Sequence, residues 1–211
     1  MKRVKTAATL WLALCAWVSA CAQTIEHNQT GTQGGYFYSF WTDAPGTVSL
    51  MLGEGGRYGV QWNATGNFTA GKGWRIGGPR VVSFSGSFDG GSNGYLAVYG
   101  WTVNPLVEYY VVENHGDWVP PGGEPIGEVA SDGGVYKIYK TVRVQQPSIQ
   151  GTKTFNQYWS VRTQVRSAGS VTMANHFAAW AKLGLPMGDF DYMIVETEGY
   201  KSSGHADITV Q

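Results

Sequence analysis

The stretch NGYLAVYGWTVNPLVEYYVVE, residues 93–113, decides the fold. Successive residues of an extended strand point to opposite faces, so this stretch divides into two kinds of surface. Before the turn at Asn104-Pro105, one face is aliphatic and the other comprises Tyr95, Ala97, Tyr99 and Trp101. After the turn, Glu108 shares a face with Tyr110, and the reverse face comprises Val107, Tyr109 and Val111. We therefore predict paired strands with an aliphatic core face and a ring-lined face that contains a carboxylate, a surface suited to a sugar.

The beginning of the chain predicts a secretory signal peptide. Three basic residues within positions 2–5 precede an apolar run over residues 7–20, which is too short to span a bilayer. We expect cleavage near Ala20-Cys21-Ala22, so that residues 1–22 are the leader and residues 23–211 form one domain outside the cell. An alternative is a bacterial lipoprotein signal, in which Cys21 carries a lipid anchor at the cell surface. We expect no membrane span.

The composition restricts the class of ligand. The 211 residues contain 15 basic and 15 acidic side chains, and loss of the leader removes three of the basic ones. No basic stripe remains, which argues against nucleic acid as a partner. Both cysteines, Cys15 and Cys21, lie in the leader, so the remaining chain has neither a disulfide nor a thiol nucleophile. A weakly charged, exported domain rich in Gly, Trp and Tyr indicates a neutral polysaccharide as its ligand.

Short stretches rich in Val, Tyr, Thr, Phe and Trp alternate with glycine clusters along the chain. Strands of this length between turn signals predict an all-β sandwich or jelly roll. The predicted strands are residues 35–41, 46–53, 57–62, 67–70, 80–87, 94–102, 106–114, 126–130, 134–144, 153–164, 191–199 and 204–210.

One segment, residues 175–184, has the apolar spacing of a helix instead. Asn175 is the expected N-cap and Gly184 the expected stop signal. A single helix packed on the sheets fits this pattern, and we expect its Trp180 to be a core residue rather than part of a site.

Carboxyl groups on aromatic strand faces are the candidates for chemistry, because hydrolysis of a glycosidic bond needs two of them. Glu108 is one. In the stretch YMIVETEGY, residues 192–200, alternation places Glu196 and Glu198 together on one face with Tyr192 and Tyr200. The pattern alone does not choose between Glu196 and Glu198. It does place Glu113 on the face opposite Glu108, provided that the strand has no bulge.

These observations coincide with a family resemblance. The chain resembles the glycoside hydrolase family 11 endo-1,4-β-xylanases over nearly all of its length after the leader. The motifs that carry the resemblance are GYLAVYGW (94–101), NPLVEYY (104–110), QYWSVR (157–162), TEGYKSSG (197–204), TGNF (65–68), GKGW (71–74) and SDGG (131–134).

The resemblance implies a β-jelly roll of two antiparallel sheets that form a deep cleft, with one α-helix behind them. It also implies hydrolysis of internal β-1,4 bonds of xylan with retention of configuration, by a catalytic domain that needs no metal and no cofactor. We expect the chain to act as a monomer. The four histidines are scattered without the spacing of metal ligands, in agreement with that expectation.

The resemblance assigns Glu108 as the nucleophile and Glu198 as the acid/base, a choice that alternation left open. Pro147 lies in the tight turn at the tip of a hairpin over the substrate, called the thumb. With the ring-lined faces described above, the predicted substrate-binding residues are Trp41, Asn67, Tyr95, Tyr99, Trp101, Tyr110, Arg143, Pro147, Gln157, Tyr192 and Tyr200.

The expected chemistry requires different protonation states of the two carboxyls. Glu108 must be ionised to attack, and we expect Tyr phenols and Arg143 to donate to it. Glu198 must hold its proton, and both burial and the charge of Glu108 raise its pKa. Asn67 stands where acid-adapted members carry Asp, which predicts activity nearer neutral pH.

The chain departs from the family in three places. Val103 stands where the family usually has Arg, the loop over residues 115–124 differs, and Glu196 replaces a usually small residue close to Glu198. Two other functions are compatible with parts of the pattern. A non-catalytic carbohydrate-binding β-sandwich would need the aromatic face without two facing carboxylates. A β-glucanase would use a similar jelly roll on a different glycan.

Overall fold

The computed structural model describes residues 23–211, and the predicted leader over residues 1–22 lies outside the described residues. Within the described part, no helix is long and apolar enough to cross a bilayer. The strands are β1 (Gln23–Ile25), β2 (Gln29–Gln33), β3 (Tyr36–Thr42), β4 (Val48–Leu52), β5 (Arg57–Trp62), β6 (Asn67–Trp74), β7 (Val81–Asp89), β8 (Gly94–Val103), β9 (Val107–His115), β10 (Gly127–Ser131), β11 (Gly134–Gln146), β12 (Lys153–Arg162), β13 (Ala168–Thr172), β14 (Asp189–Tyr200) and β15 (Gly204–Val210). The helix is α1 (Met173–Lys182).

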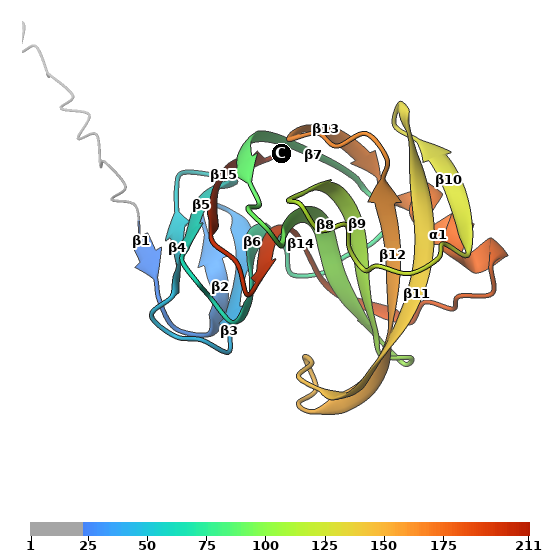
Figure 1. Cartoon of the computed structure of the whole chain (residues 1–211), viewed down its shortest axis with the longest axis horizontal. Helices are drawn as coiled ribbons and strands as arrows, with labels where there is room; N and C mark the ends of the chain where they lie inside the picture. Colours follow the sequence, from blue (N-terminus) through green and yellow to red (C-terminus); the bar gives the residue numbers. More distant parts are fainter. Residues whose placement is uncertain (1–22) are drawn as a thin grey trace, which may run out of the picture.

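The strands form two sheets, as predicted for a jelly roll. The smaller sheet has the order β1-β4-β5-β15-β7-β13, and the larger has the order β10-β11-β12-β9-β8-β14-β6-β3-β2. Figure 1 shows the larger sheet strongly curved, with the β11–β12 hairpin extending past the other strands. One pair departs from the expected antiparallel arrangement. Strand β12 lies parallel to β9 rather than antiparallel to it. Strands β10 and β11 come between them in the sequence, so the chain runs in the direction of β9 again when it reaches β12.

The alternation predicted for residues 93–113 is confirmed, and it separates two apolar clusters. Leu96 and Val98 belong to the core between the sheets, together with Tyr109. Tyr99 and Tyr110 belong to a second cluster on the other side of the larger sheet, which also contains Tyr95, Ala97 and Trp101. The larger sheet is therefore packed on both faces over β8 and β9, with aliphatic residues inside and aromatic rings outside.

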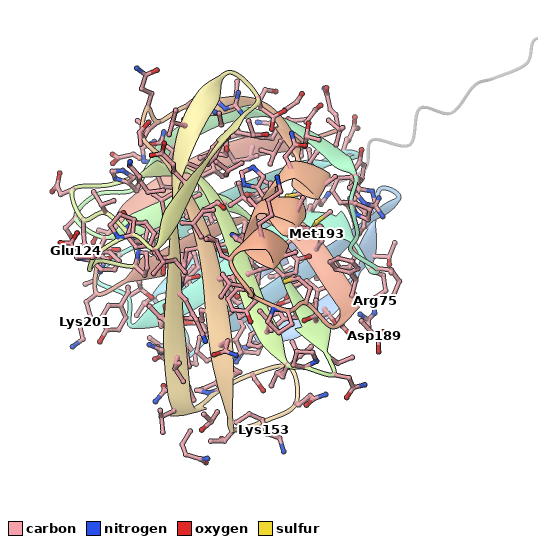
Figure 2. The ribbon with its side chains drawn as sticks, turned by 90° about the vertical axis from the view of Figure 1, so that its right-hand side faces the viewer. Arg75, Glu124, Lys153, Asp189, Met193 and Lys201 are labelled. Carbon is pink, nitrogen blue, oxygen red and sulfur yellow. The ribbon has the colours of Figure 1, made fainter. Side chains whose placement is uncertain are left out.

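Helix α1 covers the core side of the larger sheet. Trp180 is fully buried, as predicted, and packs against Tyr109 and Tyr158. Figure 2 views the molecule from this side, with α1 near the core residue Met193. The predicted N-cap was wrong. Thr172 precedes the helix, whereas Asn175 lies inside it and donates to Ser131 Oγ at 2.9 Å.

The glycines of β6 explain why that strand is longer than predicted. The sequence places a turn after residue 70, but the strand continues to Trp74. A Cβ atom on Gly71 would lie 2.0 Å from the carbonyl oxygen of Val195, and one on Gly73 would lie 2.3 Å from that of Met193. These glycines therefore permit close approach of β14 rather than a turn. Strands β1, β2 and β13 were also missed, since they are short and carry few buried side chains.

Glu113 faces away from Glu108, although the strand contains the irregularity that the prediction assumed absent. The register of β8 against β9 shifts between Leu96 and Ala97. The Glu113 carboxylate is buried on the core side, where it accepts from Tyr136 Oη at 2.6 Å and forms an ion pair with Arg166. Glu113 is thus a structural residue beside α1.

Candidate functional site

A cavity of about 1070 Å³ opens on the aromatic side of the larger sheet. Strands β8, β9 and β14 form its floor, and residues 146–149 of the β11–β12 hairpin contribute to its wall. All the residues predicted for the site line this cavity, namely Trp41, Asn67, Tyr95, Tyr99, Trp101, Glu108, Tyr110, Arg143, Pro147, Gln157, Tyr192, Glu198 and Tyr200. The fold therefore brings together side chains from β3, β6, β8, β9, β11, β12 and β14.

Glu108 lies on β9 and is 7% exposed, and its carboxyl is held between two donors. Tyr99 donates its phenol to Oε1 at 2.7 Å, and the Gln157 amide donates to Oε2 at 2.6 Å. Burial raises the pKa of Glu108, while the hydrogen bonds from Gln157, Tyr99 and Tyr110 lower it, as does the nearby charge of Arg143. Donors to both oxygens favour the ionised form, which suits a nucleophile.

Neighbouring side chains orient both donors. Thr141 donates to Gln157 Oε1 at 2.8 Å and accepts from Trp159 Nε1 at 3.1 Å. Because the amide oxygen is occupied, the Gln157 amide nitrogen is the group that faces Glu108. On the other side, Trp101 Nε1 donates to the Tyr99 hydroxyl at 2.7 Å, which leaves the Tyr99 proton for Glu108. Glu108 is therefore the end point of two fixed hydrogen-bond chains.

Glu198 lies on β14, 5% exposed, with fewer donors than Glu108. Tyr95 donates to its Oε1 at 2.7 Å, whereas its Oε2 has no partner within residues 23–211. Burial raises the pKa of Glu198 to about 8, and the charge of Glu108 acts in the same direction. Hydrogen bonds from Tyr95 and Tyr110 and the charge of Arg143 oppose this rise. Glu198 therefore holds a proton at neutral pH.

The two carboxyls are electrostatically linked. The charge of Glu108 raises the pKa of Glu198, so Glu108 is the first of the two to ionise. The Tyr110 hydroxyl lowers the pKa of both groups by hydrogen bonding, and its ring is fixed by stacking on Trp159 at 3.7 Å and 5°. The same phenol therefore favours the ionised form of both carboxyls.

Arg143 differs from its predicted role. We expected it to donate to Glu108, but its guanidinium lies toward the thumb and donates to Gln146 Oε1 at 3.4 Å. It acts on both carboxyls through its charge, and Gln157 supplies the second donor. The side chain of Arg143 is exposed on β11, and the strand carries it past the buried end of the cavity.

The turn at the tip of the thumb comes directly after Gln146 in the sequence. Within it, Ser148 Oγ accepts from Gln150 N at 3.0 Å and donates to Gly151 O at 2.6 Å, beside Pro147. Gly151 has a φ of +79°, which glycine adopts without strain. Lys153, labelled in Figure 2, begins β12 at the same end of the hairpin. The turn is therefore braced by its own hydrogen bonds.

The remaining predicted residues line the wall around the carboxyls. Tyr192 is buried beside Tyr99, with ring centroids 6.0 Å apart. Tyr200 is 43% exposed, and Trp41 is half-buried. Asn67 lies opposite Tyr200 in the β6–β14 pair, and its Oδ1 has no partner in the described part of the chain.

Sequence reasoning missed several lining residues. Trp159 and Thr141 orient groups around Glu108, and both lie on strands that the sequence predicted. The sequence could have predicted Trp159. It is two residues from Gln157 on β12, so the two side chains share a face of the strand. The other missed residues include Ser39, Thr69, Trp118, Ile149 and Phe155.

Comparisons with known proteins agree with this geometry. Residues 33–209 match the model of the family described as glycosyl hydrolases family 11. A probable endo-1,4-beta-xylanase B of Aspergillus clavatus is 54% identical over 195 residues, 92% of this chain and 88% of the relative. Endo-1,4-beta-xylanase 2 of Rhizopus oryzae is 53% identical over 210 residues, 96% of this chain and 97% of the relative.

A solved structure gives the same result for the fold. It comes from a comparison of two major endo-1,4-beta-xylanases from Trichoderma reesei, with a TM-score of 0.76 and 42% identity, and covers 90% of this chain and 99% of the other. The chain belongs to glycoside hydrolase family 11. It is a glycoside hydrolase, in agreement with the resemblance found in the sequence.

The Gln157 hydrogen bond predicts a shift in pH dependence. Gln157→Leu removes a donor that favours the ionised form of Glu108, so the pKa of Glu108 rises. A hydrogen bond to a charged group is worth enough to shift a pKa by about one unit. We expect the acid limb of the pH profile of kcat/KM for hydrolysis to move to higher pH by about one unit.

Gln61→Leu, an exposed change on β5 in the other sheet, is the matched control and should leave the limb in place. An unchanged acid limb in Gln157→Leu would mean that Gln157 does not control the ionisation of Glu108.

Proposed function

We propose that this protein is an endo-1,4-β-xylanase that hydrolyses internal β-1,4 bonds of xylan with retention of configuration. The observation that carries the retaining mechanism is the coupling of two carboxyls in one ring-lined cavity. Glu108 and Glu198 both line it, and the charge of Glu108 raises the pKa of Glu198, as expected for two carboxyls at short range. Retaining enzymes need roughly 5–5.5 Å, whereas inverting enzymes need room for a water between the carboxyls.

In the first step, Glu108 attacks the anomeric carbon and Glu198 gives its proton to the leaving oxygen. The part of the glycan that received the proton departs with a new hydroxyl. The part that contains the anomeric carbon remains bound to Glu108 as an ester. The geometry supports these roles because Glu108 has donors to both oxygens, while Glu198 has a raised pKa of about 8. The proton and the nucleophile are thus supplied from two separate groups.

In the second step, Glu198 takes a proton from water, and the water oxygen attacks the anomeric carbon. The bond to Glu108 breaks, and Glu108 leaves as the carboxylate. Glu198 can act as a base at this stage because esterification removes the Glu108 charge that raised its pKa. Two displacements at one carbon return the original configuration.

The cavity wall supports a neutral glycan as substrate. Its floor and sides present aromatic rings, among them Trp41, Tyr99 and Trp101, and ring faces stack on sugars without needing charge. The names of the similar proteins from Aspergillus clavatus and Rhizopus oryzae support xylan in particular. We further propose that the protein is exported and acts as a monomer outside the cell.

The stereochemistry of the first product tests this function. Wild-type protein should release reducing sugar from xylan but little from carboxymethyl-cellulose, and NMR of the first product should show the β-anomer. Glu108→Gln should lose this activity by several orders of magnitude because it removes the nucleophile.

An α-anomer as first product would contradict retention. Preference for carboxymethyl-cellulose would indicate a β-glucanase, and binding without release in the wild type would indicate a carbohydrate-binding module.

The role of Glu198 is tested by the leaving group. Glu198→Ala should lose most activity on xylan, whose leaving oxygen needs a proton. It should lose much less in forming the glycosyl-enzyme from an aryl xyloside with an acidic phenol, because that group departs unprotonated. Pre-steady-state release of the phenol measures this step. Equal losses on both substrates would contradict the acid role of Glu198.

A further inference from the structure

A third carboxyl, that of Glu196, lies beside the proposed acid/base. Glu196 is two residues before Glu198 on β14, so both side chains point to the same side of the sheet. Unlike Glu198, Glu196 is fully buried and does not line the cavity. Its cross-strand neighbours are Ala97 on β8 and Gly71 on β6, whose small size leaves room for a buried carboxyl on the cleft side of the sheet.

The oxygen atoms around Glu196 lack a donor. Both of its carboxyl oxygens are buried without a hydrogen-bond partner within residues 23–211, and so is Oε2 of Glu198. The other oxygen of Glu198 is occupied by Tyr95. The two carboxyls are two residues apart on one face of β14, and a hydrogen bond between them is among the causes that raise the pKa of Glu196. When Glu198 is a carboxylate, these three oxygens would all be acceptors in a dry interior, which is costly, and a proton on Glu196 turns one of them into the missing donor.

The groups that face Glu196 favour its neutral form. Burial raises its pKa far above the usual range, and the charges of Glu198 and Glu108 raise it further. Gly71 on β6 pairs with Glu196, and Ser39 on β3 pairs with Gly71 on its other side. Neither Gly71 nor Ser39 has a side chain that titrates. The other titratable groups around it are phenols, those of Tyr58, Tyr95, Tyr99, Tyr110 and Tyr192.

We propose that Glu196 remains a neutral carboxylic acid throughout the cycle and positions Glu198 by donating a hydrogen bond to its Oε2. This inference rests on the proposed role of Glu198. Glu196 touches no substrate, so it is a positioning residue. Its donor favours the ionised form of Glu198 and counteracts the effect of burial. That help matters most in the second step, when Glu198 must be a carboxylate.

The direct test is the ionisation of Glu196 itself. Protein labelled with ¹³C at the Glu carboxyl carbons is titrated by NMR, and Glu196→Gln identifies the signal by its loss. We expect the Glu196 signal to stay at the protonated position through the pH range around 8 in which Glu198 ionises. Ionisation of Glu196 at or below that range would overturn the proposal.

Two variants test the effect on catalysis. Glu196→Gln keeps a donor of the same length, so the alkaline limb of kcat/KM should stay within about half a pH unit of wild type. Glu196→Leu has a similar volume and no donor, so the pKa of Glu198 and the alkaline limb should rise by about one unit. A fall of the limb in both variants would show that Glu196 carries a negative charge, and no shift in either would show no coupling.

Failure of this inference differs from failure of the proposed function. If Glu198 is not the acid/base, Glu198→Ala loses activity on both kinds of substrate, while the Glu196 signal still reports its own protonation. If Glu198 has the proposed role and Glu196 does not, Glu198→Ala still loses much less activity on the aryl xyloside than on xylan. The NMR titration then shows Glu196 ionising at or below the pH range in which Glu198 ionises.

Discussion

Two buried carboxyls in one ring-lined cavity are the constraint on which the site depends. Glu108 and Glu198 are both removed from water, which raises the pKa of each. The difference between them comes from donors: Glu108 accepts from Tyr99 and Gln157, whereas Glu198 accepts from Tyr95. Because like charges at short range cannot both be stable, the group with more donors ionises first and raises the pKa of the other. Environment, rather than residue type, separates the proposed nucleophile from the proposed acid.

The fold meets this constraint through the curvature of one sheet. Strands β8 and β14 are neighbours, and β9 lies on the far side of β8, so Glu198 and Glu108 come from strands separated by one. The aromatic rings between them form an apolar cluster of their own, in which Tyr110 stacks on Trp159. These rings bury the carboxyls, and we propose that their flat faces also stack on the substrate. On the reverse side, Tyr109 packs against Trp180 of α1 and fixes β9 from behind.

The sequence predicted much of the fold and many of the residues that line the cavity, but not their contacts. Alternation in residues 93–113 was enough to place Leu96 in the core and Tyr99 outside it, because a strand has a strict period of two. Glycine was misleading in β6, where Gly71 permits close packing of a neighbouring strand rather than a turn. Tyr99 donates to Glu108, as predicted for the Tyr phenols, but the other predicted donor, Arg143, was wrong, and Gln157 takes its place. Which of two polar side chains reaches a carboxylate depends on cross-strand register, which local pattern does not contain.

The most direct measurement is the pKa of Glu198 before and after Glu108 is esterified. A 2-deoxy-2-fluoro xyloside with an activated leaving group should trap the glycosyl-enzyme, and ¹³C NMR of labelled Glu reports each carboxyl. The coupling between the two groups predicts a pKa of Glu198 of about 8 in the free protein and a fall of at least one unit after trapping. An unchanged pKa, or a label on a residue other than Glu108, would contradict the account.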